Sequence, residues 1–279
     1  MEVLISTFVI SIGLLGLAAL LPVGRFTIVE TGKADRAGAC GRAGLHDVKI
    51  RRMLDSNNWS NAPTTSSFVI DPIGVQAGRG ATLGLLDRIS LAGWTAPMIE
   101  QVFMWHDDLV FNMPKDVDIR PSVMSTGLEP QGDYTWFVTV TPAYSESSLP
   151  FNQRQLFTVS VVVCYKRDLS DGGVEVWEKG EQVTTATILG GGYGGGSVNL
   201  AAPIEIREDE WIMLFNAASG QCHWYRVAAA GNSPTDKLSL TGPDWNTSNG
   251  STATAVAIKS VVGVYTATVE LDRYSIWNK

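Results

Sequence analysis

The sequence predicts an α+β fold: a long N-terminal hydrophobic helix followed by a β-rich globular domain, mostly antiparallel. Two observations predict it. Residues 3–24 carry no charge, and a helix that is apolar on every face for so long is rarely the buried helix of a soluble core. Residues 134–142 and 155–167 are rich in β-branched and aromatic residues that alternate along the chain, which is typical of strands. We place the helix in residues 1–54 and the β-rich domain in residues 55–279.

Composition sets the outer limits on what the chain does. Its 279 residues are 45% hydrophobic and 18% charged, so it can bury a core and is not disordered as a whole. The net charge of -7 argues against a general nucleic-acid-binding protein. Three cysteines are too few for a disulfide framework and lack metal-site spacing. One bridge between Cys164 and Cys222 is an alternative to free thiols if the chain leaves the cytoplasm.

The N-terminal apolar run is long enough to cross a membrane. Its 22 uncharged residues span about 33 Å as a helix, enough for the hydrocarbon core. We therefore expect residues 2–24 to be transmembrane, with Gly13, Gly16 and Pro22 as packing positions. A secretory signal peptide fits less well, because no basic residue precedes the run and its only small pair is Ala18-Ala19. The basic residues all follow the run, so the positive-inside rule alone puts the body in the cytoplasm.

The stretch EVLISTFVISIGLLGLAALLPVG, which begins at Glu2, resembles the N-terminus of type IV pilin-like proteins, most closely the minor pilins and pilus-modification proteins. This family carries a prepilin-type cleavage and methylation sequence, in which a prepilin peptidase removes a basic leader that ends in glycine. The leader, its glycine and the phenylalanine that follows it do not precede Glu2 here, so we expect the translation start to lie upstream. The alternative is a degenerate member of the family that is not processed. Such a leader would supply the missing basic residues and direct the body outward. The resemblance also implies a pilin-like fold.

Glu2 takes its expected role from the same resemblance. A carboxylate placed deep in lipid costs about 3 kcal/mol on insertion scales, and buried acids usually pair with a cation or become protonated. The resemblance implies that Glu2 pairs with the free N-terminal amine of a neighbouring subunit and sets the register between subunits. The alternative is an acid at the headgroup level, favoured there by the helix dipole.

Residues 25–54 predict an amphipathic continuation of the helix. Apolar residues form an approximate stripe with charges between them, and the small residues of positions 38–44 permit close packing. Pro22 and Gly24 predict a kink or an end, and the DSNN run at 55–58 predicts the stop. A helix lying on the membrane surface is the alternative for this stretch.

The pattern of the second half of the chain predicts short strands with turn residues between them. Beyond the two strands already named, we expect strands around residues 210–217, 222–230 and 237–241 and one or two in residues 253–274. The DLSDGG run at 168–173 predicts a hairpin turn. The ATLGLLDRIS run at 81–90 predicts a short helix. The strand segments also resemble the sheet domains of pilin-like proteins, a looser likeness that rests on ordinary strand composition.

No segment predicts a catalytic constellation, a metal site or a cofactor, and we expect a protein that is not an enzyme. The glycine-rich run at 190–196 lacks the Gly-Lys-Ser/Thr ending of a phosphate loop and is better read as a strand connection. The WHDD run at 105–108, His46 and His223 have no partner at zinc-site spacing. Asp168 and Asp171 have the oxygens for calcium, but turns select the same residues. Two glycosylation patterns near Asn246 are too common to decide anything.

Two function classes remain from the sequence. In the first, the chain is a minor pilin or pseudopilin, a subunit of a type IV pilus or type II secretion-like filament. Its expected partners are other pilin-like subunits, the bacterial inner membrane and a prepilin peptidase, with the C-terminal domain in the periplasm or on a filament. In the second, it is a membrane-anchored exported binding module with an aromatic surface for carbohydrate or an envelope protein. That surface would draw on a set of tryptophans: Trp94, Trp105, Trp136, Trp177, Trp211, Trp224 and Trp245.

Overall fold

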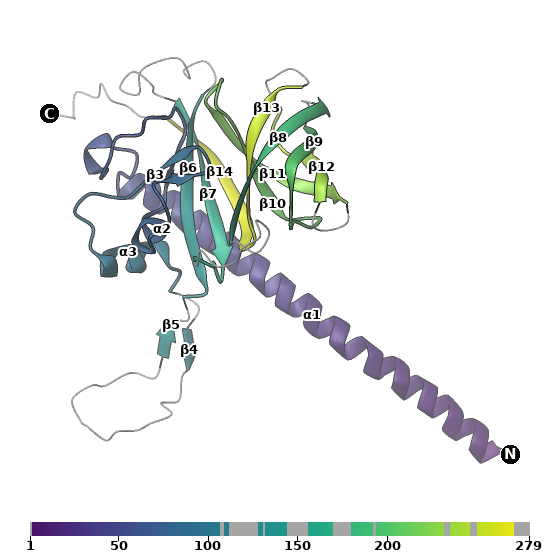
Figure 1. Ribbon diagram of the computed structural model, residues 1–279. Helices are drawn as coiled ribbons and strands as arrows, with labels where there is room; N and C mark the ends of the chain where they lie inside the picture. Colours follow the sequence, from purple (N-terminus) through teal and green to yellow (C-terminus); the bar gives the residue numbers. More distant parts are fainter. Residues whose placement is uncertain are drawn as a thin grey trace, which may run out of the picture.

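The computed structural model of the chain contains a long helix, an open sheet and a closed barrel (Figure 1). It describes residues 2–106, 109–111, 128–130, 132–143, 156–169, 180–191, 194–231, 235–245 and 250–270. The first half of helix α1 projects from the body, and its second half runs along the open sheet (Figure 1). The barrel lies on the other side of that sheet, so the sheet is the middle layer.

Helix α1 (Glu2–Ile50) is 49 residues long and continues through Pro22. It ends before the predicted stop, because Arg52 adopts a left-handed φ of 51°, a conformation that breaks a helix. The DSNN run has a different role from the one predicted. There the Asp55 carboxylate accepts a hydrogen bond from the Asn57 N–H at 3.0 Å and caps the short 3-10 helix η1 (Ser56–Asn58).

The open sheet has the strand order β14-β7-β6-β1-β3-β2. Its strands are β1 (Phe68–Ile70), β2 (Thr82–Leu83), β3 (Leu86–Ile89), β6 (Tyr134–Pro142), β7 (Leu156–Tyr165) and β14 (Val261–Glu270). Strand β6 is buried along its whole length. Its alternate residues face two cores: Trp136 and Val138 pack with α1, while Phe137 packs with the barrel. Helices α2 (Pro72–Gln76) and α3 (Ala96–Phe103) join the core on the α1 side, and β4 (Leu109–Phe111) pairs with β5 (Leu128–Pro130).

The barrel closes in the order β10-β11-β12-β9-β8-β13. Its strands are β8 (Glu181–Gly191), β9 (Gly195–Ile204), β10 (Trp211–Asn216), β11 (Gln221–Ala230), β12 (Thr235–Thr241) and β13 (Thr252–Ile258). All its strand pairs are antiparallel. Inside, small residues such as Ala255 share the core with the large Tyr225 and Trp245. Small and large side chains together fill the interior of a narrow barrel.

The predicted fold class is wrong. Of the residues that the structure describes, 44% lie in strands and 29% in helices, and the strands from β8 to β13 form a closed barrel. That is unlike a long hydrophobic helix with one pilin-like domain. In the ranges the structure describes, no helix is long and apolar enough to cross a membrane. The error has a physical reason: antiparallel strands with the same local pattern can extend one sheet or close on themselves, and only their register decides.

One local prediction changes, and one alternative is decided. The ATLGLLDRIS run is not a helix but holds β2 and β3, joined by a tight turn in which Gly84 has a φ of +62°. Strand β3 is held in place by parallel pairing with β1, a partner distant in sequence. The final apolar stretch is two strands, β13 and β14, which the turn at Lys259 and Ser260 separates into barrel and sheet.

Candidate functional site

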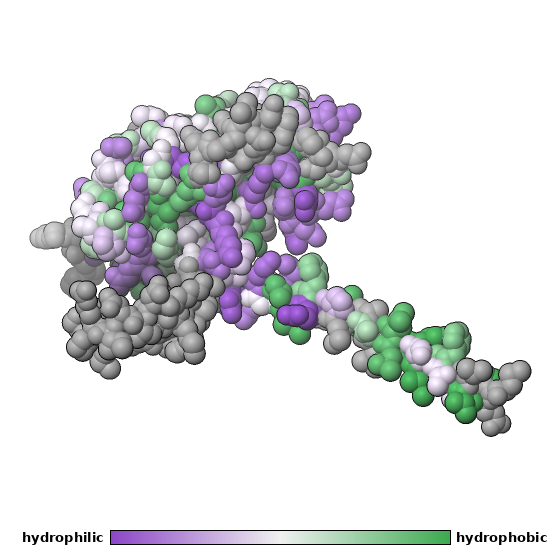
Figure 2. Space-filling view, turned by 60° about the horizontal axis from the view of Figure 1, so that its bottom comes forward, coloured by the Kyte–Doolittle hydropathy of each residue, from purple (hydrophilic) through white to green (hydrophobic). Residues whose placement is uncertain are grey.

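The first half of α1 exposes large apolar side chains that nothing in the body covers. Their exposed fractions run from 54% at Val29 to 76% at Val3 and Leu15. Phe8, Val9 and Ile10 occupy successive positions about 100° apart around the axis, so no face of this half is polar. Figure 2 shows these apolar residues along the projecting helix. The described set is Val3, Ile5, Phe8, Val9, Ile10, Ile12, Leu14, Leu15, Leu20, Val23, Phe26, Ile28 and Val29.

The hydroxyl groups on α1 are bonded within the helix itself. Thr7 donates to the carbonyl of Val3 at 3.0 Å, and Ser11 donates to that of Thr7 at 2.8 Å. Thr27 and Thr31 repeat the arrangement more than four turns further along the helix, each donating to the carbonyl four residues earlier. A hydroxyl bonded in this way needs no water. This half of the helix can therefore enter an apolar environment without leaving these donors unsatisfied.

The site residues expected from the sequence lie on this exposed half. Gly13 and Gly16 are open positions: a Cβ built on either would meet nothing within 4 Å. Pro22 lies inside the helix and is exposed. Glu2 is the first residue of α1, and its side chain lies outside the described part of the structure. The packing roles of the three helix residues and the pairing of Glu2 stay predictions.

The second half of α1 is fixed to the sheet by small residues. Ala37 and Cys40 are fully buried, and Gly41 and Gly44 lie on the same face. A Cβ on Gly44 would lie 2.9 Å from Val161 and 3.2 Å from the Trp136 ring, so the backbone can approach the sheet only because the side chain is absent. The Trp136 indole in turn donates to the Val102 carbonyl at 2.9 Å. The direction in which the apolar half projects is therefore set by close packing.

A buried cluster of charges connects the sheet to the barrel. The Arg167 guanidinium donates to both oxygens of Asp71, at 2.8 and 2.7 Å, and to Glu181 at 2.9 Å. Arg88 donates to Glu181 at 2.7 Å and lies 3.3 Å from Asp71. Burial alone would raise the pKa of Asp71, but the two guanidinium charges, with hydrogen bonds from Arg167 and the Gly74 N–H, hold it below its ordinary value.

The sequence did not predict this cluster, and no local signal would have found it. Asp71 follows β1, Arg88 lies in β3, Arg167 follows β7 and Glu181 begins β8. The four residues come from four separate segments, and sheet pairing alone brings them together. Because two cations face two anions, the charges balance without an additional ion. We assign the cluster a structural role: it fixes the barrel on the sheet.

The remaining sequence candidates do not form a site in the described residues. The glycine-rich run is the connection from β8 to β9, and Asp244 accepts a hydrogen bond from the Gly194 N–H at 2.7 Å. His223 lies in β11, where burial lowers its pKa, and His46 is exposed on α1. No group of three or more His, Cys, Asp or Glu residues is placed to hold a metal there. Asp107, Asp108, Asp171 and Asn246 lie outside the described residues.

The cysteines and tryptophans that the sequence singles out are mostly buried. Cys40, Cys164 and Cys222 are all free and buried, so Cys164 and Cys222 form no bridge. Trp136, Trp224 and Trp245 are core residues rather than parts of an aromatic surface. Trp94, Trp105 and Trp211 are half-buried, and Trp177 lies outside the described residues.

Comparison with known proteins finds no relative: no protein-family model matches the chain, and no curated protein matches it. The exposed half of α1 is therefore the feature from which a function is argued.

Proposed function

We propose that this protein is a structural subunit of a filament, of the kind that minor pilins and pseudopilins build. The apolar half of α1 is the assembly element, buried among the same helices of neighbouring subunits. The β-rich body faces outward and lies outside the cytoplasm, in the periplasm or on a surface filament. The observation that carries the proposal is the exposure of thirteen large apolar side chains on all faces of one projecting half-helix.

The free energy available from these side chains is large enough to drive association. Burying one Leu, Ile or Phe side chain contributes about 1.5–3 kcal/mol. Association costs about 4–15 kcal/mol in lost freedom of motion. Burial of about half of the thirteen therefore offsets that cost. Left exposed, the same residues would form an apolar surface that monomeric soluble proteins rarely present.

The distribution around the helix supports several neighbours rather than one. A single partner covers one face, and the stripe it requires is narrow. Here apolar residues occupy every face, so the helix is best satisfied at the centre of a bundle of like helices. Gly13 and Gly16 give places where another backbone can come close. The internally bonded hydroxyls remove the main polar obstacle to such packing.

The rigid junction between α1 and the body supports an ordered filament rather than an aggregate. The buried small residues of the second half fix the helix on β6, β7 and β14. Each subunit then presents its body at the same angle to the bundle. Where the contact between neighbouring subunits is head-to-tail and its rotation does not close a ring, such subunits form an open helical array.

The alternative from the sequence, a binding module with an aromatic surface, has less support. Three of its seven tryptophans are buried, one in each of three hydrophobic cores, so they are not available to a carbohydrate or a protein partner. The proposal therefore rests on the helix and not on the body.

The experiment that tests the proposal compares two full-length variants. Ile10→Arg with Leu14→Arg places charges in the apolar half, where both residues are more than 60% exposed. Thr185→Arg with Thr187→Arg adds the same charge to the barrel surface as a matched control. We expect sedimentable filaments, visible by negative-stain electron microscopy, from wild type and control but not from the helix variant. Filaments from the helix variant at the wild-type level would refute the proposal.

Glu2 gives a finer test. Glu2→Leu keeps the helix apolar, so the chain should still partition with apolar surfaces. If the carboxylate sets the register, the variant should enter filaments less well than wild type. Equal incorporation of wild type and Glu2→Leu would remove Glu2 from the proposal and leave the apolar packing as its basis.

A further inference from the structure

Strand β14 forms one edge of the open sheet. It is ten residues long and pairs with β7, and in the described part of the chain no strand pairs with its other side. The described residues outside the sheet make no backbone hydrogen bond to that side either. Every second residue of an edge strand directs its N–H and C=O groups outward. β14 therefore presents a row of donors and acceptors with which another strand can pair.

This edge lacks the features that usually protect an exposed edge strand, which are short length, proline and lysine. β14 contains no proline and no lysine, and its one charged residue is Glu270 at its end. Its register with β7 shifts between Val261 and Gly263 and is regular from Gly263 onward. The strand at the opposite edge of the sheet, β2, is only two residues long. Of the two edges, β14 is therefore the one that can accept a strand along most of its length.

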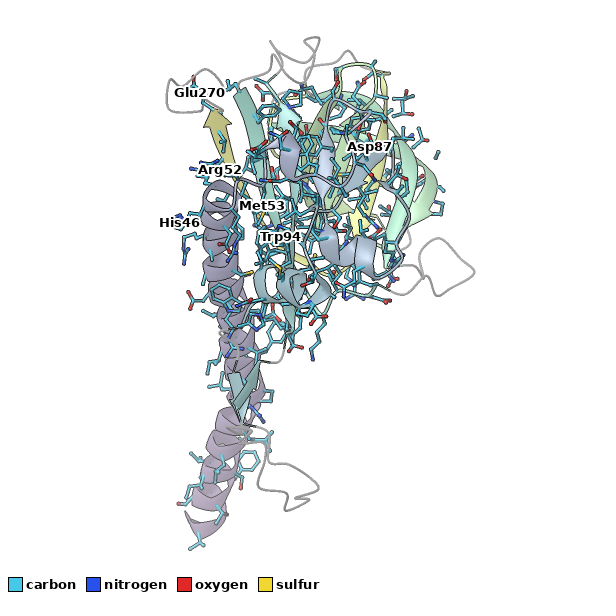
Figure 3. All side chains as sticks on the ribbon, turned by 90° about the vertical axis from the view of Figure 1, so that its left-hand side faces the viewer. His46, Arg52, Met53, Asp87, Trp94 and Glu270 are labelled. Carbon is cyan, nitrogen blue, oxygen red and sulfur yellow. The ribbon has the colours of Figure 1, made fainter. Side chains whose placement is uncertain are left out.

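The flank of α1 on this side of the molecule is basic. Arg42, His46 and Lys49 follow a spacing of four and then three residues, so they share one helix face, and all three are exposed. Arg52 is exposed just beyond the helix end. We call these four residues the basic flank. Figure 3 shows His46 and Arg52 on the same side of the molecule as Glu270, the last residue of β14.

The basic flank lies next to β14. A Cβ built on Gly38 would lie 3.4 Å from Nη1 of Arg42 and 3.6 Å from the hydroxyl of Tyr265 in β14, so the two side chains meet at one point of α1. Burial raises the pKa of Tyr265, and the nearby charge of Arg42 opposes that rise. A strand added to the outer side of β14 would therefore lie beside these cations.

The charges available to an added strand are mainly positive. Arg42, Lys49 and Arg52 have no acidic partner within 4.0 Å among the residues that the structure describes. Two acids stand against them: Asp35, two turns before Arg42 on the same helix face, and Glu270 at the end of the strand. Acidic side chains on the added strand are therefore favoured and basic ones disfavoured. Antiparallel pairing of β14 with β14 of a second copy would bring two basic flanks together, so like charges oppose that contact.

We propose that the outer edge of β14 binds an extended acidic segment of another protein, which joins the six-stranded open sheet as an additional edge strand. Main-chain hydrogen bonds to β14 supply affinity that does not depend on sequence. The basic flank supplies the preference for acidic side chains. The inference goes beyond the proposed function, because it concerns the body and does not depend on the apolar half of α1.

The test measures binding of two synthetic peptides to the full-length protein. Each peptide has the length of β14, is capped at both ends, and alternates valine with either glutamate or lysine, so that one face of the strand is charged. We expect the glutamate peptide to bind about tenfold more tightly than the lysine peptide, as read by fluorescence anisotropy. Arg42→Glu with Lys49→Glu should reverse this preference. Arg207→Glu with Lys237→Glu, which changes the net charge equally at two exposed residues after β9 and in β12, is the matched control and should keep it.

Amide hydrogen exchange, read residue by residue by mass spectrometry, locates the bound peptide. Alternate amides of residues 262–270 should gain protection in the complex, because every second residue faces the added strand. Binding without this pattern would refute strand addition, and equal affinity for the two peptides would refute the acidic partner. Protection of β14 that rises with protein concentration in the absence of peptide would assign the edge to a second copy instead.

Two further results separate this inference from its neighbours. The variant with Ile10→Arg and Leu14→Arg should bind the glutamate peptide as wild type does, although it should not assemble. Normal filaments from wild type together with no peptide binding would overturn this inference and leave the proposed function standing. A reversal at Arg42 and Lys49 that weakens binding to phosphatidylglycerol vesicles, and leaves the affinity for both peptides unchanged, would assign the basic flank to lipid and refute its role beside β14.

Discussion

The ring of Tyr265 in β14 lies directly against Gly41 in α1, and a Cβ built on Gly41 would overlap that ring. The absence of a side chain at one helix position therefore determines how closely α1 approaches the sheet. The same ring lies close to Gly263, where an added Cβ would come within 2.9 Å. Tyr265 thus fills a space that two glycines leave open, one in each layer. This contact attaches the second half of α1 to the sheet.

Filling that space should weaken the attachment of α1. We expect Gly41→Leu to lower the free energy of unfolding by about 1–3 kcal/mol, because an overpacked core must shift. Gly32→Leu is the matched control, since a Cβ there meets nothing within 4 Å and glycine is a poor helix residue. Urea unfolding followed by tryptophan fluorescence measures both. Equal stability of the two variants would contradict the close packing.

Breaking the buried charge cluster should be more costly. Arg167→Met leaves two buried carboxylates, Asp71 and Glu181, to share Arg88 alone, and we expect a loss of about 3–5 kcal/mol in the free energy of unfolding. The exposed pair between Lys259 and Glu205 is the comparison. Lys259→Met should cost less than about 1 kcal/mol. A loss at Arg167 no larger than that at Lys259 would show that the cluster does not fix the barrel on the sheet.

The cluster also predicts a dependence of stability on pH. The pKa of Asp71 is lowered from its ordinary value of 3.8, so the folded state favours the ionised carboxylate. Its contribution is complete above the unfolded-state pKa and is lost as the pH falls through the lower folded-state pKa. We expect wild type to lose stability below about pH 4 more steeply than Asp71→Asn. Parallel losses in the two proteins, measured by urea unfolding at a series of pH values, would assign the acid sensitivity to other groups.

The buried thiols should react slowly. Burial raises the pKa of Cys164 to about 11 and that of Cys222 to about 12. At pH 8 a thiol with the Cys164 value has about two orders of magnitude less thiolate than an ordinary cysteine. We expect no appreciable modification by a maleimide in the folded protein and three modified residues in guanidinium chloride, as read by mass spectrometry. Rapid labelling of the folded protein would contradict the burial of these residues.

Local pattern predicts part of this structure and not the rest. Strands β6 and β7 lie where alternating β-branched and aromatic residues indicate strands, because that pattern reports local burial. Closure of the barrel depends on the register between β8 and β13, whose paired residues are 65 to 77 positions apart in sequence. No single segment encodes that register. The sequence does not predict the charge cluster for a similar reason. Asp71 and Arg167 are far apart in sequence and meet only after the sheet has formed.

The exposed half of α1 is predictable from the sequence only in part. Its composition is visible in the sequence, and so is the absence of charge from residue 3 to residue 24. The sequence does not say where the body begins to cover the helix. That boundary follows from the small residues between Ala37 and Gly44, because only there can the backbone approach β14 and β7. Arg52 ends the attached half by its left-handed backbone.

The measurement that tests the central claim most directly is a crosslink between the apolar halves of neighbouring subunits. Leu14→Cys adds one exposed thiol to a chain whose own three cysteines are buried. A short bismaleimide, added to the assembled full-length protein and quenched before denaturation, should convert most of this variant to covalent dimers. Thr185→Cys, exposed on the barrel, is the matched control and should give few. Monomer alone from the Leu14→Cys variant, in a preparation that sediments as filaments, would contradict a filament core built from the apolar halves of α1.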